Sequence, residues 1–162
     1  MDRILVLDFG GQYNQLIARR VREQHVYAEV RSYDRMTLSE IKDGGYNGII
    51  FTGGPNSVYD LSSPHCDPGM LRLGIPVLGI CYGAQLIAHM TGGQVEGAHG
   101  TSEYGKTILK TVSHPLFKGI PERSICFNLS LSRSVAIPHS SFTDWHLRYP
   151  VNVFMVPLFI EG

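Results

Sequence analysis

Short apolar runs alternate with amphipathic stretches along the first half of the chain. Residues 3–9 form an almost unbroken apolar run, which predicts a strand buried on both faces of a parallel sheet. Residues 12–24 show the 3.6-residue period of a helix. That period predicts a surface helix with Leu16, Ile17 and Val21 turned towards the sheet.

The alternation continues to about residue 91 and predicts an α/β fold. Thr37 and Glu40 are spaced as a capping box at the start of one predicted helix. We expect a doubly wound, mostly parallel sheet with helices on both faces. The predicted elements are strands at 26–30, 48–51 and 75–80, helices at 37–42, 68–73 and 82–91, and further strands at 94–96 and 106–111, the last a candidate antiparallel strand.

The composition of the chain changes near Pro121. Seventeen of the 18 glycines lie at or before Gly119, the last lysine is Lys118, and serine and large apolar residues dominate afterwards. We therefore expect a first domain over residues 1–123 and a tail of different character over 124–162. The tail either completes the sheet, with 155–161 as a late strand, or is poorly ordered.

Charge and cysteine usage exclude several classes of function. The chain has 14 basic and 14 acidic residues and no block of like charges, which argues against a nucleic-acid or membrane-surface partner. No apolar stretch approaches the roughly 20 residues of a membrane span, and the N-terminus lacks the pattern of a signal peptide. Three cysteines at unrelated spacings favour neither a disulfide framework nor a metal site, so we expect a cytoplasmic protein without a metal.

Cys81 is the strongest candidate for a catalytic residue. A predicted strand runs into the segment Gly79-Ile80-Cys81-Tyr82-Gly83, and a predicted helix runs out of it. Glycines two residues to either side of a nucleophile allow the sharp strand-to-helix elbow that lifts it out of a sheet. The helix dipole favours a thiolate at that place. The alternative is a buried and inert core cysteine, which is what most single cysteines are.

A cysteine that attacks a carbonyl needs donors for the developing oxyanion. Gly53 and Gly54 end the preceding predicted strand, so their backbone N–H groups are expected beside the elbow. The N–H of Tyr82 is the second candidate donor, and an ordinary Gly-Gly-Pro turn is the alternative. No histidine ends an evident strand with an acid two residues later, and His114 has the context of a surface turn. The glycines near Phe9 match no nucleotide-binding pattern.

Several segments resemble the class I (triad) glutamine amidotransferases, and within that family the N-terminal glutaminase domains of GMP synthases. The resemblance covers about residues 1–123, three-quarters of the chain, and implies a flavodoxin-like three-layer fold. It also implies that residues 1–123 are an incomplete domain of this family and that residues 124–162 are a divergent tail. The segments that carry it are Ile4–Tyr13, Arg19–Glu23, Thr52–Tyr59 and Gly79–Gln85, extended by 103–106 and 115–121.

The resemblance implies a mechanism and a partner. Cys81 would attack the side-chain amide of L-glutamine and form a glutamyl thioester, while Gly53, Gly54 and Tyr82 hold the oxyanion. Ammonia would pass to an ATP-pyrophosphatase synthetase domain or subunit that converts XMP to GMP. ATP and magnesium would belong to that synthetase, so we expect no cofactor in this chain. The glutamine-binding residues implied are Gln85, Gly79 and Gly83.

The sequence departs from the family pattern in its last quarter. A Trp-Met-Ser-His-like run is expected near 126–134, where this chain has Cys-Phe-Asn-Leu-Ser-Leu-Ser, and no His-Pro-Glu segment occurs. We expect residues from about Ser124 to derive from a frameshift or similar rearrangement with an early stop. If neither other reading frame of the coding DNA restores a Ser-His segment, this hypothesis is wrong.

Three functions remain open at this point. The chain is a glutaminase that is inactive or weak alone because its His-Glu partners are absent, or a non-catalytic pseudo-amidotransferase fragment that keeps the fold. The third is another class I amidotransferase or a γ-glutamyl hydrolase. The segment Asn56–Tyr59 argues against the third.

Overall fold

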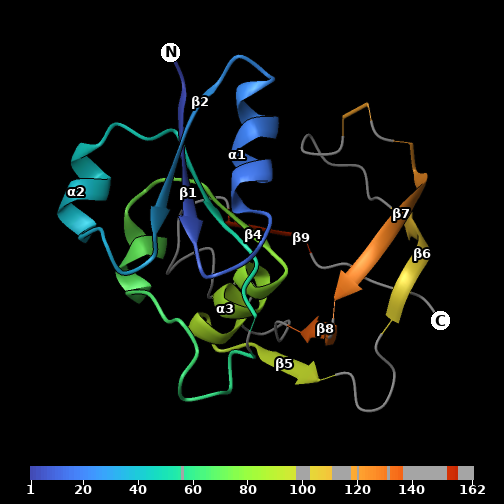
Figure 1. Ribbon diagram of the computed structural model, residues 1–162. Coiled ribbons are helices and arrows are strands. Elements are labelled where there is room, and N and C mark those ends of the chain that lie inside the picture. The colour runs from blue at the N-terminus through green and yellow to red at the C-terminus, as the bar shows by residue number, and fades with distance from the viewer. Residues whose placement is uncertain are drawn as a thin grey trace.

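A five-stranded parallel sheet forms the centre of the computed structural model, which describes residues 1–55, 57–97, 103–110, 118–119, 121–130, 132–136 and 153–156 (Figure 1). The strand order is β2-β1-β3-β4-β9, and every neighbouring pair is parallel. The order places β3 between β1 and β4. The bounds are β1 Arg3–Asp8, β2 Tyr27–Ser32, β3 Gly48–Phe51, β4 Val77–Ile80 and β9 Val153–Val156.

Helices cover both faces of this sheet, as a doubly wound fold requires. Helix α1, Asn14–Arg22, packs on one face, where Ala18 joins Val6 and Ile50 in a buried cluster. The opposite face is covered by α2 (Leu38–Asp43), the 3₁₀ helix η1 (Pro68–Arg72) and α3 (Tyr82–Met90). Figure 1 shows α1 and α2 on opposite sides of β1. The predicted fold class is therefore confirmed.

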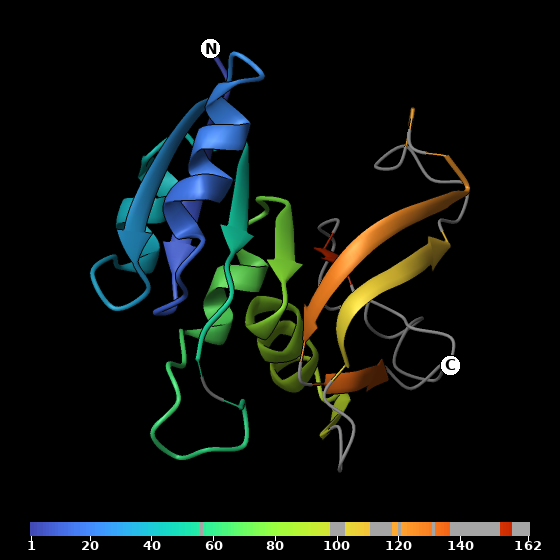
Figure 2. The same cartoon turned by 45° about the vertical axis from the view of Figure 1, so that its right-hand side comes forward.

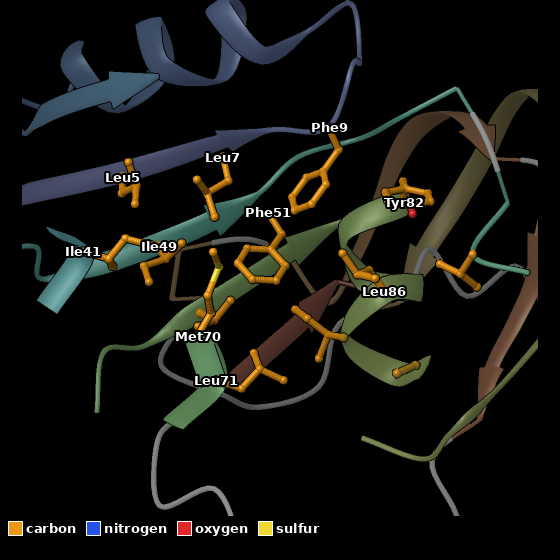
Figure 3. Close-up of a cluster of buried hydrophobic side chains, with 14 of the residues drawn as sticks. Leu5, Leu7, Phe9, Ile41, Ile49, Phe51, Met70, Leu71, Tyr82 and Leu86 are labelled. Carbon is orange, nitrogen blue, oxygen red and sulfur yellow. The ribbon is translucent and has the colours of Figure 1, made fainter. Parts of the chain in front are cut away.

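The larger core cluster lies on the face of α2, η1 and α3. Leu5 and Leu7 of β1 point there, together with Ile49 and Phe51 of β3, whereas Val6 points to α1 (Figure 3). Successive residues of a strand thus point to opposite faces of the sheet, and both faces are buried under helices. This two-sided burial is why the strands read as unbroken apolar runs in the sequence.

Two antiparallel ribbons accompany the parallel sheet. Strand β5 (Gln94–Gly97) pairs with β8 (Ser132–Ala136), and β6 (Glu103–Lys110) pairs with β7 (Arg123–Ser130) (Figure 2). The strand expected at 94–96 is confirmed. The strand expected at 106–111 is confirmed as antiparallel as far as Lys110, and residue 111 lies outside the described residues. Their partners β7 and β8 were not predicted.

The strand β9 lies beside β4 in parallel register, with Val153 opposite Val77. The late strand expected at 155–161 overlaps β9 in its first two residues, and residues 157–161 lie outside the described part of the chain. Described strands lie on both sides of residue 123, and the domain boundary expected there stays a prediction. Among the described residues, no helix is long and apolar enough to cross a bilayer.

Two local predictions were wrong. Leu16 is 46% exposed, whereas the buried residues of α1 are Asn14 and Ala18. Leu16 lies two positions from each of them, about 200° around the helix axis, so it faces away from the sheet. The strand expected at 75–80 begins only at Val77, because Pro76 has no N–H to donate to a neighbouring strand.

The predicted capping box of α2 is confirmed and supports a measurement. Glu40 N–H donates to the Thr37 hydroxyl at 3.2 Å, and Thr37 N–H donates to the Glu40 carboxylate at 2.7 Å. A Thr37→Ala variant should unfold with a free energy lower by about 1 kcal/mol in a urea titration. Thr37→Ser is the matched control and should keep most of the stability, because it retains the hydroxyl. Equal losses in the two variants would show that the cap contributes nothing.

Candidate active site

Cys81 occupies the turn between β4 and α3. Strand β4 ends at Ile80 and α3 begins at Tyr82, so this one residue reverses the path of the chain. Its backbone adopts φ 54° and ψ −115°, and it is one of two non-glycine residues with positive φ among those described. Such a conformation is strained and tends to occur at functional sites. The elbow predicted from the sequence is therefore present.

The glycines beside the elbow are required by close packing. A Cβ atom on Gly79 would lie 2.7 Å from the backbone nitrogen of Ala84. A Cβ atom on Gly83 would lie 2.3 Å from the carbonyl oxygen of Phe51. Strand and helix can approach this closely only when both positions lack a side chain. The roles of Gly79 and Gly83 in glutamine binding stay predictions.

Gly53 and Gly54 lie next to the elbow at the carboxyl end of β3. A Cβ atom on Gly53 would be 3.8 Å from the Cβ of Cys81, and one on Gly54 would be 2.9 Å from Phe9 O. On the other side, a Cβ atom on Gly11 would lie 2.5 Å from Gly53 O. The loops after β1 and β3 are thus in direct contact, and the candidate oxyanion donors sit between Gly11 and Cys81.

Tyr82 turns its side chain away from the site and into the core. Its ring is 1% exposed and packs against Phe9 with centroids 5.8 Å apart (Figure 3). Its hydroxyl donates to Pro64 O at 2.5 Å, and burial raises the pKa of the phenol. Only the backbone of Tyr82 therefore remains for chemistry at the elbow. Its N–H is the first of α3, which no carbonyl of the helix itself accepts.

Gln85 lies one helical turn after Cys81, as predicted from the sequence. Its backbone N–H donates to Cys81 O at 3.2 Å, so the two residues belong to the same turn. Its side chain is 8% exposed, which is unusual for an amide. A buried polar side chain at this place suits a residue that orients a polar substrate, and this role stays a prediction.

The two thiols whose side chains are described differ in their surroundings. Cys81 is partly exposed at the helix terminus. Cys66 packs against Met90, with the two sulfur atoms 4.0 Å apart, and burial raises the pKa of its thiol to about 12. The raised pKa favours the protonated form of Cys66, which is a weaker nucleophile than the thiolate.

The described histidines are His25, His65 and His89. His65 and His89 contact each other with ring centroids 6.0 Å apart, and His89 also meets the ring of Tyr59. His89 is eight residues beyond Cys81 in the chain, which corresponds to about 12 Å along α3. His114 and three further histidines lie outside the described residues. The part of the chain that is described holds no group of three or more residues suited to a metal ion.

Sequence reasoning missed Thr52, which connects the parts of the site. It is 0% exposed and follows the last residue of β3. Its hydroxyl donates to Leu7 O at 2.8 Å, and its carbonyl accepts from Gly83 N–H at 3.0 Å. The sequence does show a hydroxyl residue at the end of a strand, directly before two glycines. That pattern by itself indicates only a turn.

Comparison with known proteins shows what this arrangement resembles. The family model for "Glutamine amidotransferase class-I" matches residues 5–136. Curated proteins named "GMP synthase [glutamine-hydrolyzing]" from Ruminiclostridium cellulolyticum and Acetivibrio thermocellus are 59% and 58% identical to the chain over 127 residues. Each alignment covers 78% of this chain and 24% of the relative. The chain therefore spans about a quarter of the length of these curated relatives.

Solved structures agree with the fold. A putative GMP synthase subunit protein from Thermoplasma acidophilum superposes with a TM-score of 0.68 and 28% identity, covering 86% of this chain and 69% of that one. A glutamine amidotransferase from Thermotoga maritima gives a TM-score of 0.62 at 21% identity, covering 85% and 64%. The second likeness concerns the fold alone.

Proposed function

The chain belongs to the glutamine amidotransferase class-I family, and from this we propose that it is the glutaminase part of a GMP synthase with Cys81 as its nucleophile. One observation carries the proposal. Cys81 holds a strained elbow that two glycines make possible, and Gly53 faces it across the carboxyl end of the sheet. The identity of 59% to a curated GMP synthase supports the choice within the family.

The chemistry that we propose is acyl transfer to sulfur. The Cys81 thiolate adds to the carbonyl carbon of the glutamine side-chain amide and forms a tetrahedral oxyanion. The C–N bond then breaks, the nitrogen takes up a proton and leaves as ammonia, and a γ-glutamyl thioester remains. Water attacks the thioester, releasing glutamate and regenerating the thiol. The N–H groups of Gly53, Gly54 and Tyr82 are the proposed oxyanion donors, and Gln85 is proposed to orient the amide.

Both steps need a proton carrier, which the family mechanism takes from a His-Pro-Glu segment. No such segment occurs in these 162 residues. We therefore expect the chain alone to react at Cys81 but to turn over glutamine slowly, since triad members act as a unit. A histidine supplied by a further segment or partner would restore turnover.

The partner that we propose is an ATP-pyrophosphatase synthetase domain or subunit. It would receive ammonia and convert XMP to GMP, using ATP and magnesium that this chain does not bind itself. Support comes from the curated GMP synthases, which are about four times as long as the segment matched here. The free thiols Cys66 and Cys81 fit a cytoplasmic location, because reducing compartments keep cysteines unpaired.

Labelling with the chloromethyl ketone analogue of glutamine tests the proposal. The reagent should modify Cys81 at about one label per chain at neutral pH, and excess glutamine should slow the reaction. Peptide mapping by mass spectrometry identifies the labelled residue, with Cys66, whose thiol has a raised pKa, as an internal control. Equal labelling of Cys66 and Cys81, or no protection by glutamine, would contradict a glutamine site at the elbow.

Ammonia release, measured in parallel, separates the enzyme from its alternative. A pseudo-amidotransferase would be labelled at Cys81 without releasing ammonia above the uncatalysed rate. Release above that rate that saturates with glutamine and is lost in a Cys81→Ala variant would instead establish a glutaminase.

A further inference from the structure

Thr52 connects three segments of the sheet's carboxyl edge. Its N–H and its hydroxyl both donate to Leu7 O, at 3.2 and 2.8 Å, which joins the end of β3 to β1. Its carbonyl accepts the N–H of Gly83 at 3.0 Å, which joins β3 to the first turn of α3. Through its main chain and its side chain, Thr52 therefore links β1 to the elbow that carries Cys81.

The hydroxyl of Thr52 contacts three main-chain groups. It accepts from Phe9 N–H at 3.5 Å and shares its one proton between Leu7 O, at 2.8 Å, and Gly53 O, at 3.3 Å. Thr52 itself is 0% exposed. A hydroxyl that contacts the carbonyl of the following residue restricts the orientation of the peptide group to which that carbonyl belongs.

That peptide is the one between Gly53 and Gly54. Its carbonyl oxygen faces Gly11, since a Cβ atom on Gly11 would lie 2.5 Å from it. Peptide bonds among the described residues are trans, so the Gly54 N–H points opposite to Gly53 O. Gly11 follows β1, and β3 lies between β1 and β4. A group directed away from β1 is directed towards β4 and Cys81.

We propose that Thr52 is a positioning residue, whose hydroxyl holds the Gly53 carbonyl on the β1 side and thereby turns the Gly54 N–H towards Cys81. This inference rests on the proposed function, because it assigns the orientation of a donor for the oxyanion of that reaction. In this proposal Thr52 acts on neither the thiol nor the substrate directly. It acts through the peptide that follows it and through Gly83, which belongs to the elbow.

Two electrophiles distinguish positioning from mere structural support. The chloromethyl ketone of glutamine passes through an oxyanion at its carbonyl before sulfur displaces chloride. Iodoacetamide reacts by direct displacement of iodide and forms no oxyanion. The ratio of the two second-order rate constants at Cys81 therefore reports the oxyanion site, while the iodoacetamide rate alone reports exposure and ionisation of the thiol.

Thr52→Val removes the hydroxyl at nearly constant shape and should lower this ratio at least about tenfold. The iodoacetamide rate should stay within about twofold. Thr52→Ser retains the hydroxyl and should restore the ratio to within about twofold of the unsubstituted chain. Thermal unfolding curves identify a temperature at which the compared variants are folded, and the rates are measured there. If Thr52→Val does not fold, Thr52→Ala replaces it, with the same expected fall in the ratio.

Two results would overturn the inference alone. An unchanged ratio in Thr52→Val and Thr52→Ala would show that the hydroxyl does not orient the donor. A parallel fall of both rates, not rescued by serine, would show a structural role only. If the unsubstituted chain shows no glutamine-protected labelling, the proposed function fails, and this inference fails with it.

Discussion

A Cys81→Gly variant is expected to lose all labelling by the glutamine chloromethyl ketone while its free energy of unfolding rises by about 1 kcal/mol. The loss of labelling follows from the loss of the only nucleophile at the elbow. The gain in stability follows from the backbone, because φ 54° and ψ −115° strain any residue with a Cβ atom. Relief of that strain, about 1–3 kcal/mol, exceeds the additional entropy that glycine gives the unfolded chain.

Two controls separate the two effects. Cys81→Ala should also lose labelling but gain no stability, since it keeps the Cβ atom. His25, the other described non-glycine residue with positive φ, has φ 59° and lies just beyond α1. His25→Gly should raise stability slightly and leave labelling unchanged. Urea titration with mass spectrometry of labelled chains measures both properties. A Cys81→Gly variant no more stable than Cys81→Ala would refute the view that function holds this elbow under strain.

The second large effect concerns Gly83, where alanine should lower the free energy of unfolding by about 3 kcal/mol or more. The added Cβ would lie 2.3 Å from Phe51 O and 2.6 Å from Phe51 C. Both are main-chain atoms of a buried central strand, so neither moves without distorting the sheet. The substitution should also weaken the bond from Gly83 N–H to Thr52 O and lower the rate of labelling at Cys81.

Gly74→Ala is the matched comparison for Gly83→Ala. Gly74 has φ +79° and nothing within 4 Å of an added Cβ, whereas Gly83 has tight contacts and no positive φ. Alanine at Gly74 should therefore destabilise by only about 1 kcal/mol, through backbone conformation alone. If the two variants lose equal stability in the same denaturant titration, close packing at the elbow is not what requires Gly83.

The sequence predicts the parallel part of the fold well because its signals are local. Strand β3 was expected at its observed bounds, since a four-residue apolar run with Gly-Gly after it leaves little choice. The elbow at Cys81 was also predicted, because its glycines, strand and helix lie within a few residues of one another. A cysteine with a glycine two residues to either side, between a strand and a helix, can therefore be recognised from the sequence without the tertiary structure.

The rest depends on contacts between residues distant in the chain. The pairing of β6 with β7 and of β5 with β8 depends on cross-strand neighbours that no local pattern identifies. The role of Thr52 is of the same kind, because its partner Leu7 lies 45 positions away. The helical period does not locate Leu16 correctly, because many apolar side chains of surface helices remain exposed to solvent.

The late arrival of β9 in the sheet affects how the chain folds during synthesis. Strand β4 ends at Ile80, and its parallel neighbour β9 begins only at Val153, about 70 residues later. At ribosomal rates of about 5–20 residues per second, the open side of β4 waits on the order of 4–14 s for its partner. During that time its unpaired N–H and C=O groups are available to other nascent chains. The interval of greatest aggregation risk therefore lies between the completion of α3 and the emergence of Val153, and a slower ribosome would lengthen it.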